Sequence, residues 1–152
     1  MLENNHEKTP KKYAGILAHP TSFPSPYGIG DLGKGAYRFI DFLANSGLNL
    51  WQVLPLGHTG FGDSPYQPFS AFAGQPLIID LDALKEYKLL SEDDFTDMPE
   101  WDPIHIDYGT LITFKTKLLK LAYERFTDPD YEDGLSTDEE QMAAFASFKK
   151  DS

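Results

Sequence analysis

The 152-residue chain contains no cysteine, comparatively few basic residues and no long apolar run. Without cysteine it can form no disulfide, no thiolate metal site and no cysteine nucleophile. Its 24 acidic residues outnumber 13 basic ones, which gives a formal net charge of -11. Such a chain repels phosphate backbones and anionic lipids, so neither nucleic acid nor a membrane is an expected partner. No stretch approaches the roughly 20 apolar residues of a membrane span, and no apolar signal core follows Met1, so we expect a cytoplasmic protein.

What remains is an ordinary globular composition with many aromatic residues. The chain is 41% hydrophobic and 24% charged, and it contains 11 Phe, 8 Tyr and 2 Trp. Aromatic side chains fill protein cores, but they also form flat platforms for the apolar faces of sugars. Composition alone leaves both uses open.

The N-terminal half has the pattern of an α/β fold. Residues 1–12 form a polar tail. The short apolar runs 13–19 and 48–54 are typical of buried strands. Between them, residues 35–46 repeat apolar side chains at helical spacing, namely Ala36, Phe39, Ile40 and Leu43. A strand, a helix and a strand in this order predict a βαβ unit with parallel strands and a right-handed crossover.

The C-terminal half is predicted to be mainly helical. We expect a strand at 77–81, a short helix at 82–87, a helical turn at 91–95, a long helix at 108–126 and a last helix after residue 136. The long helix has the strongest pattern, since Asp107 can cap it and one face carries Leu111, Phe114, Leu118, Leu121 and Ala122. For the last helix, Ser136 with Glu139 or Thr137 with Glu140 offers a capping box.

The irregular segment 57–75 is the best candidate for a functional loop. It follows the second predicted strand, and ligands of α/β folds bind at the carboxyl ends of parallel strands. Tyr66 and Phe61 could stack on a sugar ring, whereas Asp63, Ser64 and Gln67 could bond its hydroxyl groups. The competing interpretation is that Asp63 and Ser64 cap a turn and that the aromatic residues belong to the core.

Other candidate residues carry weaker signals. His19 follows the first predicted strand and could contact a ligand, although a structural histidine is the competing interpretation. The loop acids Asp31, Asp63, Asp80 and Asp82 form no convincing catalytic pair of carboxylates. The glycines of 28–33 lie too far beyond the strand for a dinucleotide fingerprint. The four scattered histidines do not have metal-site spacing, and no cofactor is expected.

Three sequence blocks resemble those of amylomaltases, also called disproportionating enzymes, which are 4-α-glucanotransferases. The blocks read His-Pro-Thr-Ser-Phe-Pro-Ser-Pro-Tyr-Gly-Ile-Gly-Asp-Leu-Gly at 19–33, Trp-Gln-Val-Leu-Pro-Leu-Gly at 51–57 and Gly-Phe-Gly-Asp-Ser-Pro-Tyr-Gln at 60–67. Phe-Ser-Ala-Phe-Ala-Gly at 69–74 and Asp-Tyr-Gly at 107–109 are also similar. Several blocks in the family's order, between about Tyr13 and Phe126, are more specific than any single motif.

The resemblance implies the N-terminal part of a (β/α)₈ barrel enzyme that moves α-1,4-glucan segments by a retaining double displacement. On this basis 13–97 would hold the first β/α units and 98–152 a truncated helical subdomain. A barrel needs about 250 residues, so the remainder of its own polypeptide is an expected partner, beside α-1,4-glucans. The family's catalytic carboxylates would lie beyond Ser152, and no catalytic residue is assigned here. By similarity Tyr66 would stack on the sugar beside the cleaved bond, with Asp63 and Ser64 shaping that subsite.

Two positions depart from the family's pattern. His58 stands where the family usually has Pro, and Phe61 where it usually has Tyr, so an accessory glucan contact through that hydroxyl is lost. Two alternatives to the enzyme remain: a non-catalytic glucan-binding module, and a helical interaction protein that uses 108–150. The second explains none of the loop motifs.

Overall fold

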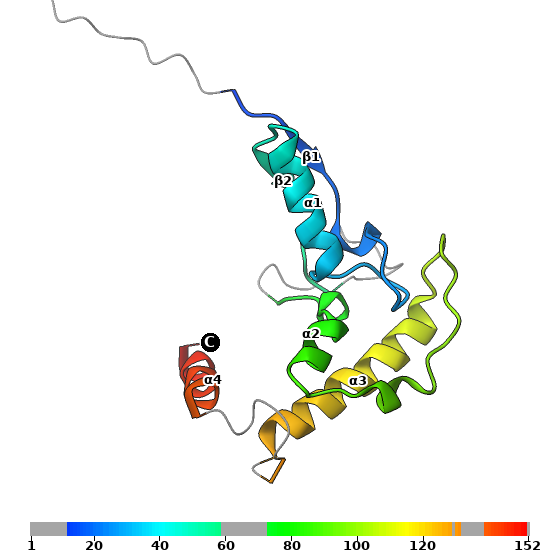
Figure 1. Ribbon diagram of the computed structural model, residues 1–152, viewed down its shortest axis with the longest axis vertical. Helices are drawn as coiled ribbons and strands as arrows, with labels where there is room; N and C mark the ends of the chain where they lie inside the picture. The colour runs from blue at the N-terminus through cyan, green and yellow to red at the C-terminus, as the bar shows by residue number, and fades with distance from the viewer. Residues whose placement is uncertain (1–11, 59–72, 129, 132–138, 152) are drawn as a thin grey trace, which may run out of the picture.

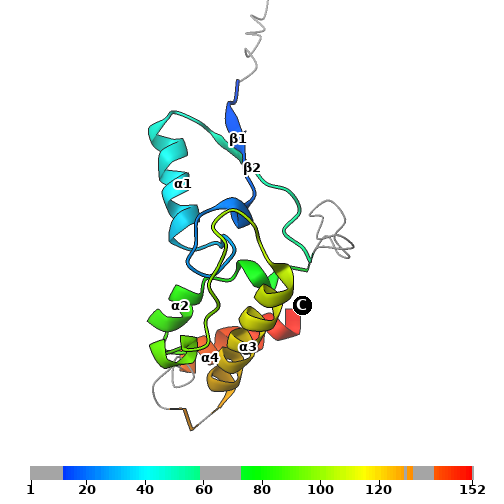
Figure 2. The same cartoon turned by 90° about the vertical axis from the view of Figure 1, so that its right-hand side faces the viewer.

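The computed structural model describes residues 12–58, 73–128, 130–131 and 139–151. Two strands, β1 (Gly15–Leu17) and β2 (Leu50–Gln52), form a parallel pair with Ile16 opposite Trp51. Helix α1 (Lys34–Asn45) connects them and lies alongside the pair (Figures 1 and 2). The predicted βαβ order and parallel pairing are confirmed, although both strands are shorter than the apolar runs that predicted them.

Helix α1 buries a narrower face than its sequence pattern predicts. Ala36 and Leu43 are buried, and Phe39 packs against Trp51 with ring centroids 5.4 Å apart. Ile40, predicted to share this face, is 46% exposed. A pair of short strands covers only part of a helix of this length, so one apolar edge of α1 has no partner among the described residues.

The predicted strand at 77–81 is wrong. The first part of the segment belongs to a 3₁₀ helix, η3 (Pro76–Ile78). Residue 81, the last of the predicted strand, begins the next helix, α2 (Leu81–Glu86). Its carbonyl groups are satisfied without a sheet partner. Lys115 Nζ donates to the oxygens of Leu77 and Ile79 at 2.7 and 3.0 Å, and Leu32 N donates to that of Ile78 at 2.9 Å. These long-range donors replace the strand neighbour that the apolar run suggested.

The C-terminal half is helical as predicted. It contains η4 (Glu92–Phe95), α3 (Tyr108–Thr127) and α4 (Glu139–Asp151). Asp107 caps α3 by accepting a hydrogen bond from Thr110 N, which confirms the predicted start. The residues proposed to cap α4 lie outside the described residues.

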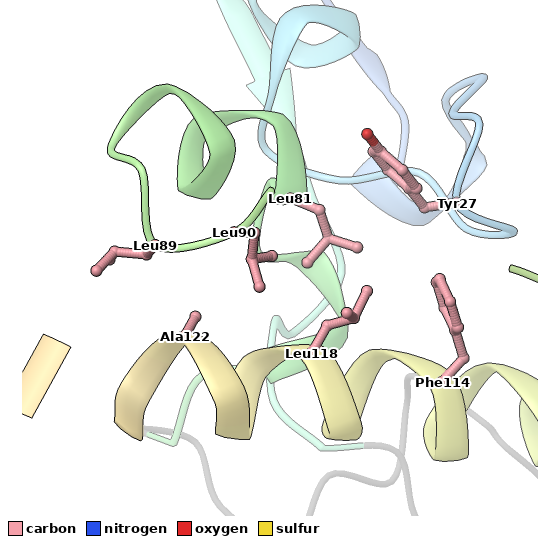
Figure 3. Packing of buried hydrophobic residues seen from close by; sticks show 7 residues of the cluster. All are labelled: Tyr27, Leu81, Leu89, Leu90, Phe114, Leu118 and Ala122. Carbon is pink, nitrogen blue, oxygen red and sulfur yellow. The ribbon is translucent and has the colours of Figure 1, made fainter. Parts of the chain in front are cut away.

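The main core lies where α3 crosses α2 and the loop after β1. Figure 3 shows Phe114, Leu118 and Ala122 on one side of α3, facing residues from two other parts of the chain. Leu81, Leu89 and Leu90 come from α2 and the segment after it, and Tyr27 comes from the loop that precedes α1. Tyr27 OH also donates to Asp82, which fastens this loop to α2. The core therefore holds the loop that follows β1 in a fixed place.

Candidate functional site

The parallel register places the carboxyl ends of β1 and β2 side by side. Ala18 N donates to Gln52 O at 3.0 Å, and the indole Nε1 of Trp51 donates to Ala18 O at 2.8 Å. These two bonds lock Ala18, the first residue beyond β1, to the last two residues of β2. As a result, His19 after β1 and the segment 54–57 after β2 meet at one edge of the sheet, as the fold class predicts.

The ring of His19 is held by the 3₁₀ turn that follows it, η1 (Pro20–Ser22). Its Nδ1 accepts from Thr21 N at 3.4 Å and lies 2.7 Å from Thr21 Oγ1. An accepting Nδ1 in a neutral ring places the proton on Nε2. Burial lowers the pKa of His19; the nearby Pro55 carbonyl raises it in part, but it is not placed to form a hydrogen bond of normal geometry with Nε2. The ring is therefore neutral at pH 7 and presents an Nε2–H donor.

Gln75 approaches the same place from the far end of the segment 57–75. Its backbone N donates to Leu56 O at 2.7 Å, so the two ends of this segment are joined at their base. Its side chain is only 7% exposed. The buried atoms Gln75 Oε1 and His19 Nε2 have no hydrogen-bond partner among the described residues. Buried polar atoms are nearly always paired, so two such atoms at one place are an informative exception.

Both side chains line one cavity of about 170 Å³ at the strand ends. Its wall is drawn from five separate parts of the chain: the turn after β1, the loop before α1, the segment after β2, the approach to η3 and the start of α3. The contributing residues include His19, Thr21, Pro55, Gly57, Gln75 and Tyr108. The wall mixes apolar surface with hydroxyl, imidazole and amide groups, which suits a small neutral polar ligand.

A second, larger hollow of about 730 Å³ lies between the loop 21–30 and the segment 98–106. Trp101 forms part of its wall and packs directly on Gly28, where a Cβ atom would come within 2.5 Å of the indole. Gly28 has a φ of 77°, so glycine is required here by its backbone as well as by the contact.

Three of the four loop acids, Asp31, Asp80 and Asp82, have structural partners. Asp31 accepts from Gly33 N and from Ser25 Oγ, and burial raises its pKa. Asp80 caps α2, and Asp82 accepts from Tyr27. Hydrogen bonds lower the pKa of Asp82, that from Tyr27 most of all. These three acids shape loops and a helix start, and Asp63 lies outside the described residues.

Of the six predicted substrate-binding residues, the structure describes one. His19 lies at the strand ends as predicted. Phe61, Asp63, Ser64, Tyr66 and Gln67 lie outside the described residues. The residue that sequence reasoning missed is Gln75. Its signal was available, because it closes the segment 57–75 immediately before Pro76. Within the described residues no group of His, Asp and Glu could hold a metal ion, and no helix is long and apolar enough to cross a membrane.

The fold and the cavity define an α/β protein with a candidate binding site at the carboxyl ends of parallel strands. Comparison with known proteins then identifies the family. The family model described as 4-alpha-glucanotransferase matches residues 18–152, and the chain belongs to this family.

Similar proteins support this assignment. The 4-alpha-glucanotransferase of Clostridium butyricum is 50% identical over 115 residues, which cover 75% of this chain and 24% of that protein. The enzyme of the same name from Thermus thermophilus is 45% identical over 136 residues, covering 90% and 25%. A solved structure, the amylomaltase from Streptococcus agalactiae in complex with acarbose, matches with a TM-score of 0.75 and 37% identity, over 92% of this chain and 27% of that one. The chain thus spans about a quarter of the length of these relatives.

Proposed function

We propose that this chain forms the N-terminal part of a 4-α-glucanotransferase, which transfers segments of α-1,4-glucan to glucose or a maltooligosaccharide. The observation that carries the proposal is the family match over 18–152, together with a cavity at the strand ends of the matched region. The similar amylomaltase structure contains acarbose, an oligosaccharide, which supports a glucan as the ligand class. The lack of cysteine fits a reducing compartment such as the cytoplasm.

The fold of the whole protein is proposed to be a (β/α)₈ barrel. Two parallel strands cannot exist alone as a stable sheet, because their outer edges leave backbone groups unpaired. In support, Leu17 and Leu50 on the strand pair are 54% and 51% exposed, and Phe42 on α1 is 53% exposed. Such apolar surface on a sheet and its crossover helix is what further β/α units of the same polypeptide would cover.

The proposed reaction is a double displacement with retention, in which one carboxylate attacks the sugar and another acts as acid and base. Among the loop acids, Asp31, Asp80 and Asp82 are held in structural bonds, and we place the two catalytic carboxylates in the rest of the polypeptide. This chain would bind the glucan instead. Tyr66 would supply a stacking face, Asp63, Ser64 and Gln67 would bond hydroxyl groups, and Phe61 would add an apolar contact.

The test compares two proteins. The 152-residue chain and the full-length polypeptide that contains it are each incubated with maltotriose, and the products are separated by length. We expect longer and shorter maltooligosaccharides from the full-length protein alone. Turnover by the 152-residue chain would refute the placement of the catalytic carboxylates, and no turnover by either protein would refute the proposed activity.

A non-catalytic glucan-binding module is the alternative that the same chain allows. The module and the enzyme are distinguished by titrating both proteins with maltoheptaose and following tryptophan fluorescence. Trp51 is a suitable reporter because its indole donates to Ala18, the residue that precedes His19. Saturable binding without turnover in the full-length protein, lost in Tyr66→Ala, would favour the module.

A further inference from the structure

Two buried polar atoms at the strand ends have complementary hydrogen-bonding roles. His19 Nε2 is a donor, because Nδ1 of the same ring accepts from Thr21 N. Gln75 Oε1 is an acceptor. Both are buried without a partner among the described residues, and both side chains line the same cavity of about 170 Å³. A group that can both accept and donate a hydrogen bond would satisfy the pair.

The His19 ring is fixed in place before any ligand arrives, and Gln75 is fixed at its backbone. Thr21 holds the His19 ring through two contacts to Nδ1, at 3.4 Å from its backbone nitrogen and 2.7 Å from its hydroxyl. Gln75 is tied through its backbone to Leu56 O, and the adjacent Pro76 begins η3. The His19 ring needs no ordering on binding, and Gln75 is already buried, so less conformational entropy is lost.

We propose that Gln75 Oε1 and His19 Nε2–H form a hydroxyl-binding pair that takes a hydroxyl group of a glucosyl unit. The inference rests on the proposed function, which supplies a glucan as the ligand. A sugar hydroxyl donates to Gln75 and accepts from His19, which leaves neither protein atom unsatisfied. The surrounding apolar wall, which includes Ile29, Leu54 and Pro55, would lie against the C–H surface of the ring.

The competing physical explanation is structural: the pair could be bonded by a permanent water or by another part of the chain. The two explanations differ in what they predict for stability. An acceptor that is buried without a partner in the free protein destabilises it, so its replacement by an apolar group of similar size does not lower the melting temperature. An acceptor that is bonded in the free protein stabilises it, so the same replacement lowers the melting temperature.

The first experiment therefore uses Gln75→Leu in the full-length polypeptide, with Asn45→Leu at the exposed end of α1 as the matched amide-to-apolar control. We expect Gln75→Leu to leave the melting temperature unchanged or higher and to weaken maltoheptaose binding by about tenfold, the value of one good hydrogen bond. The control should bind like the parent. A lower melting temperature with unchanged binding would overturn the proposal.

The second experiment isolates the donor of His19. His19→Gln keeps an N–H donor at nearly the position of Nε2, whereas His19→Leu removes it, and both lose the acceptor that Thr21 uses. We expect His19→Gln to bind maltoheptaose about tenfold more tightly than His19→Leu. Equal affinities would overturn the role of the donor.

The outcomes separate this inference from the proposed function. If the parent protein neither binds nor converts glucans, the proposed function fails. If the parent is active and the Gln75 and His19 variants bind like it, only the hydroxyl-binding pair fails. A crystal structure with maltoheptaose closes the question, since a water or a side chain of the same chain that still bridges the two atoms would also overturn the pair.

Discussion

Lys115 on α3 offers the sharpest test of the energetics of this fold. Its side chain is 0% exposed, and Nζ donates to the carbonyls of Leu77 and Ile79 at 2.7 and 3.0 Å. Burial lowers its pKa from 10.5 to about 8, although the charges of Asp31 and Asp80 oppose the change. An ammonium group is thus buried to satisfy two carbonyls that would otherwise have no partner.

The sign of the pH dependence follows from this lowered pKa. Below about pH 8 both the folded and the unfolded chain hold the proton, and the full cost of burying the charge is present. Between about pH 8 and 10.5 the unfolded chain binds more protons, so the contribution of Lys115 to stability rises with pH. The difference between 10.5 and about 8 corresponds to about 3 kcal/mol.

We predict that Lys115→Met destabilises the protein more at high pH than at neutral pH. At pH 7 the two orphaned carbonyls cost about 1–3 kcal/mol each, and removal of the buried charge offsets about 3 kcal/mol of that, which leaves about 1 kcal/mol. Above about pH 10 the neutral amine of the parent keeps both hydrogen bonds without the burial cost. The loss in the variant should then reach about 4 kcal/mol.

The assay is urea unfolding at pH 7 and pH 10.5, followed by tryptophan fluorescence. Lys117→Met is the matched control, because Lys117 lies on the same helix, is 61% exposed and pairs only with exposed Asp97 at 3.2 Å among the described contacts. It should change the free energy of unfolding by less than about 0.5 kcal/mol at both pH values. A loss in Lys115→Met that is the same at both pH values would refute the reasoning, since it would mean that folding does not change the proton affinity of this amine.

Two further predictions concern the ion pair between Asp94 and Arg125 and the glycine that faces Trp101. Arg125 donates two hydrogen bonds to Asp94, at 2.6 and 3.0 Å, and these bonds are the main cause that lowers the pKa of Asp94 to about 2. This carboxylate therefore stabilises the fold above about pH 3.8 and loses that effect as the pH falls towards 2. Asp94→Asn should cost about 2 kcal/mol at pH 7 and much less at pH 2 in thermal unfolding; an equal cost at both would contradict the ion pair. Gly28 and Gly47 both have positive φ, but only Gly28 faces Trp101. In urea titrations, Gly28→Ala should lower the free energy of unfolding by about 3 kcal/mol and Gly47→Ala by about 1 kcal/mol. Equal losses would show that the Trp101 contact does not matter.

The elements that were predicted well are those with a local cause. Helix α3 has a capping aspartate, a regular apolar face and no interrupting proline, and its residues Leu111, Phe114 and Leu118 are buried as expected. The βαβ unit follows from two apolar runs separated by one amphipathic helix. The family resemblance likewise rests on contiguous blocks, which can be recognised without any knowledge of the fold.

The errors arose where a distant partner decides the structure. The run 77–81 has the apolar content of a strand, but Lys115 and Leu32 supply its hydrogen bonds, and nothing within the run reveals this. Lys115 itself lies on the buried face of α3, where a charged residue is not expected. Ile40 has helical spacing for burial, yet its exposure depends on how much sheet lies beside α1.

Some features of the candidate site likewise follow from neighbouring residues, and others depend on distant ones. The sequence by itself determined the family, the order of the β/α elements and the position of His19 after a strand, because each depends on neighbouring residues. Only the tertiary structure brought Gln75 to His19 across 56 positions and left both polar atoms facing one cavity, whereas the bond from Thr21 N to His19 Nδ1 is a local contact two residues away. The physical reason is that the surroundings of a side chain depend on which groups are near in space, and the cavity that His19 and Gln75 line is built from separate parts of the chain.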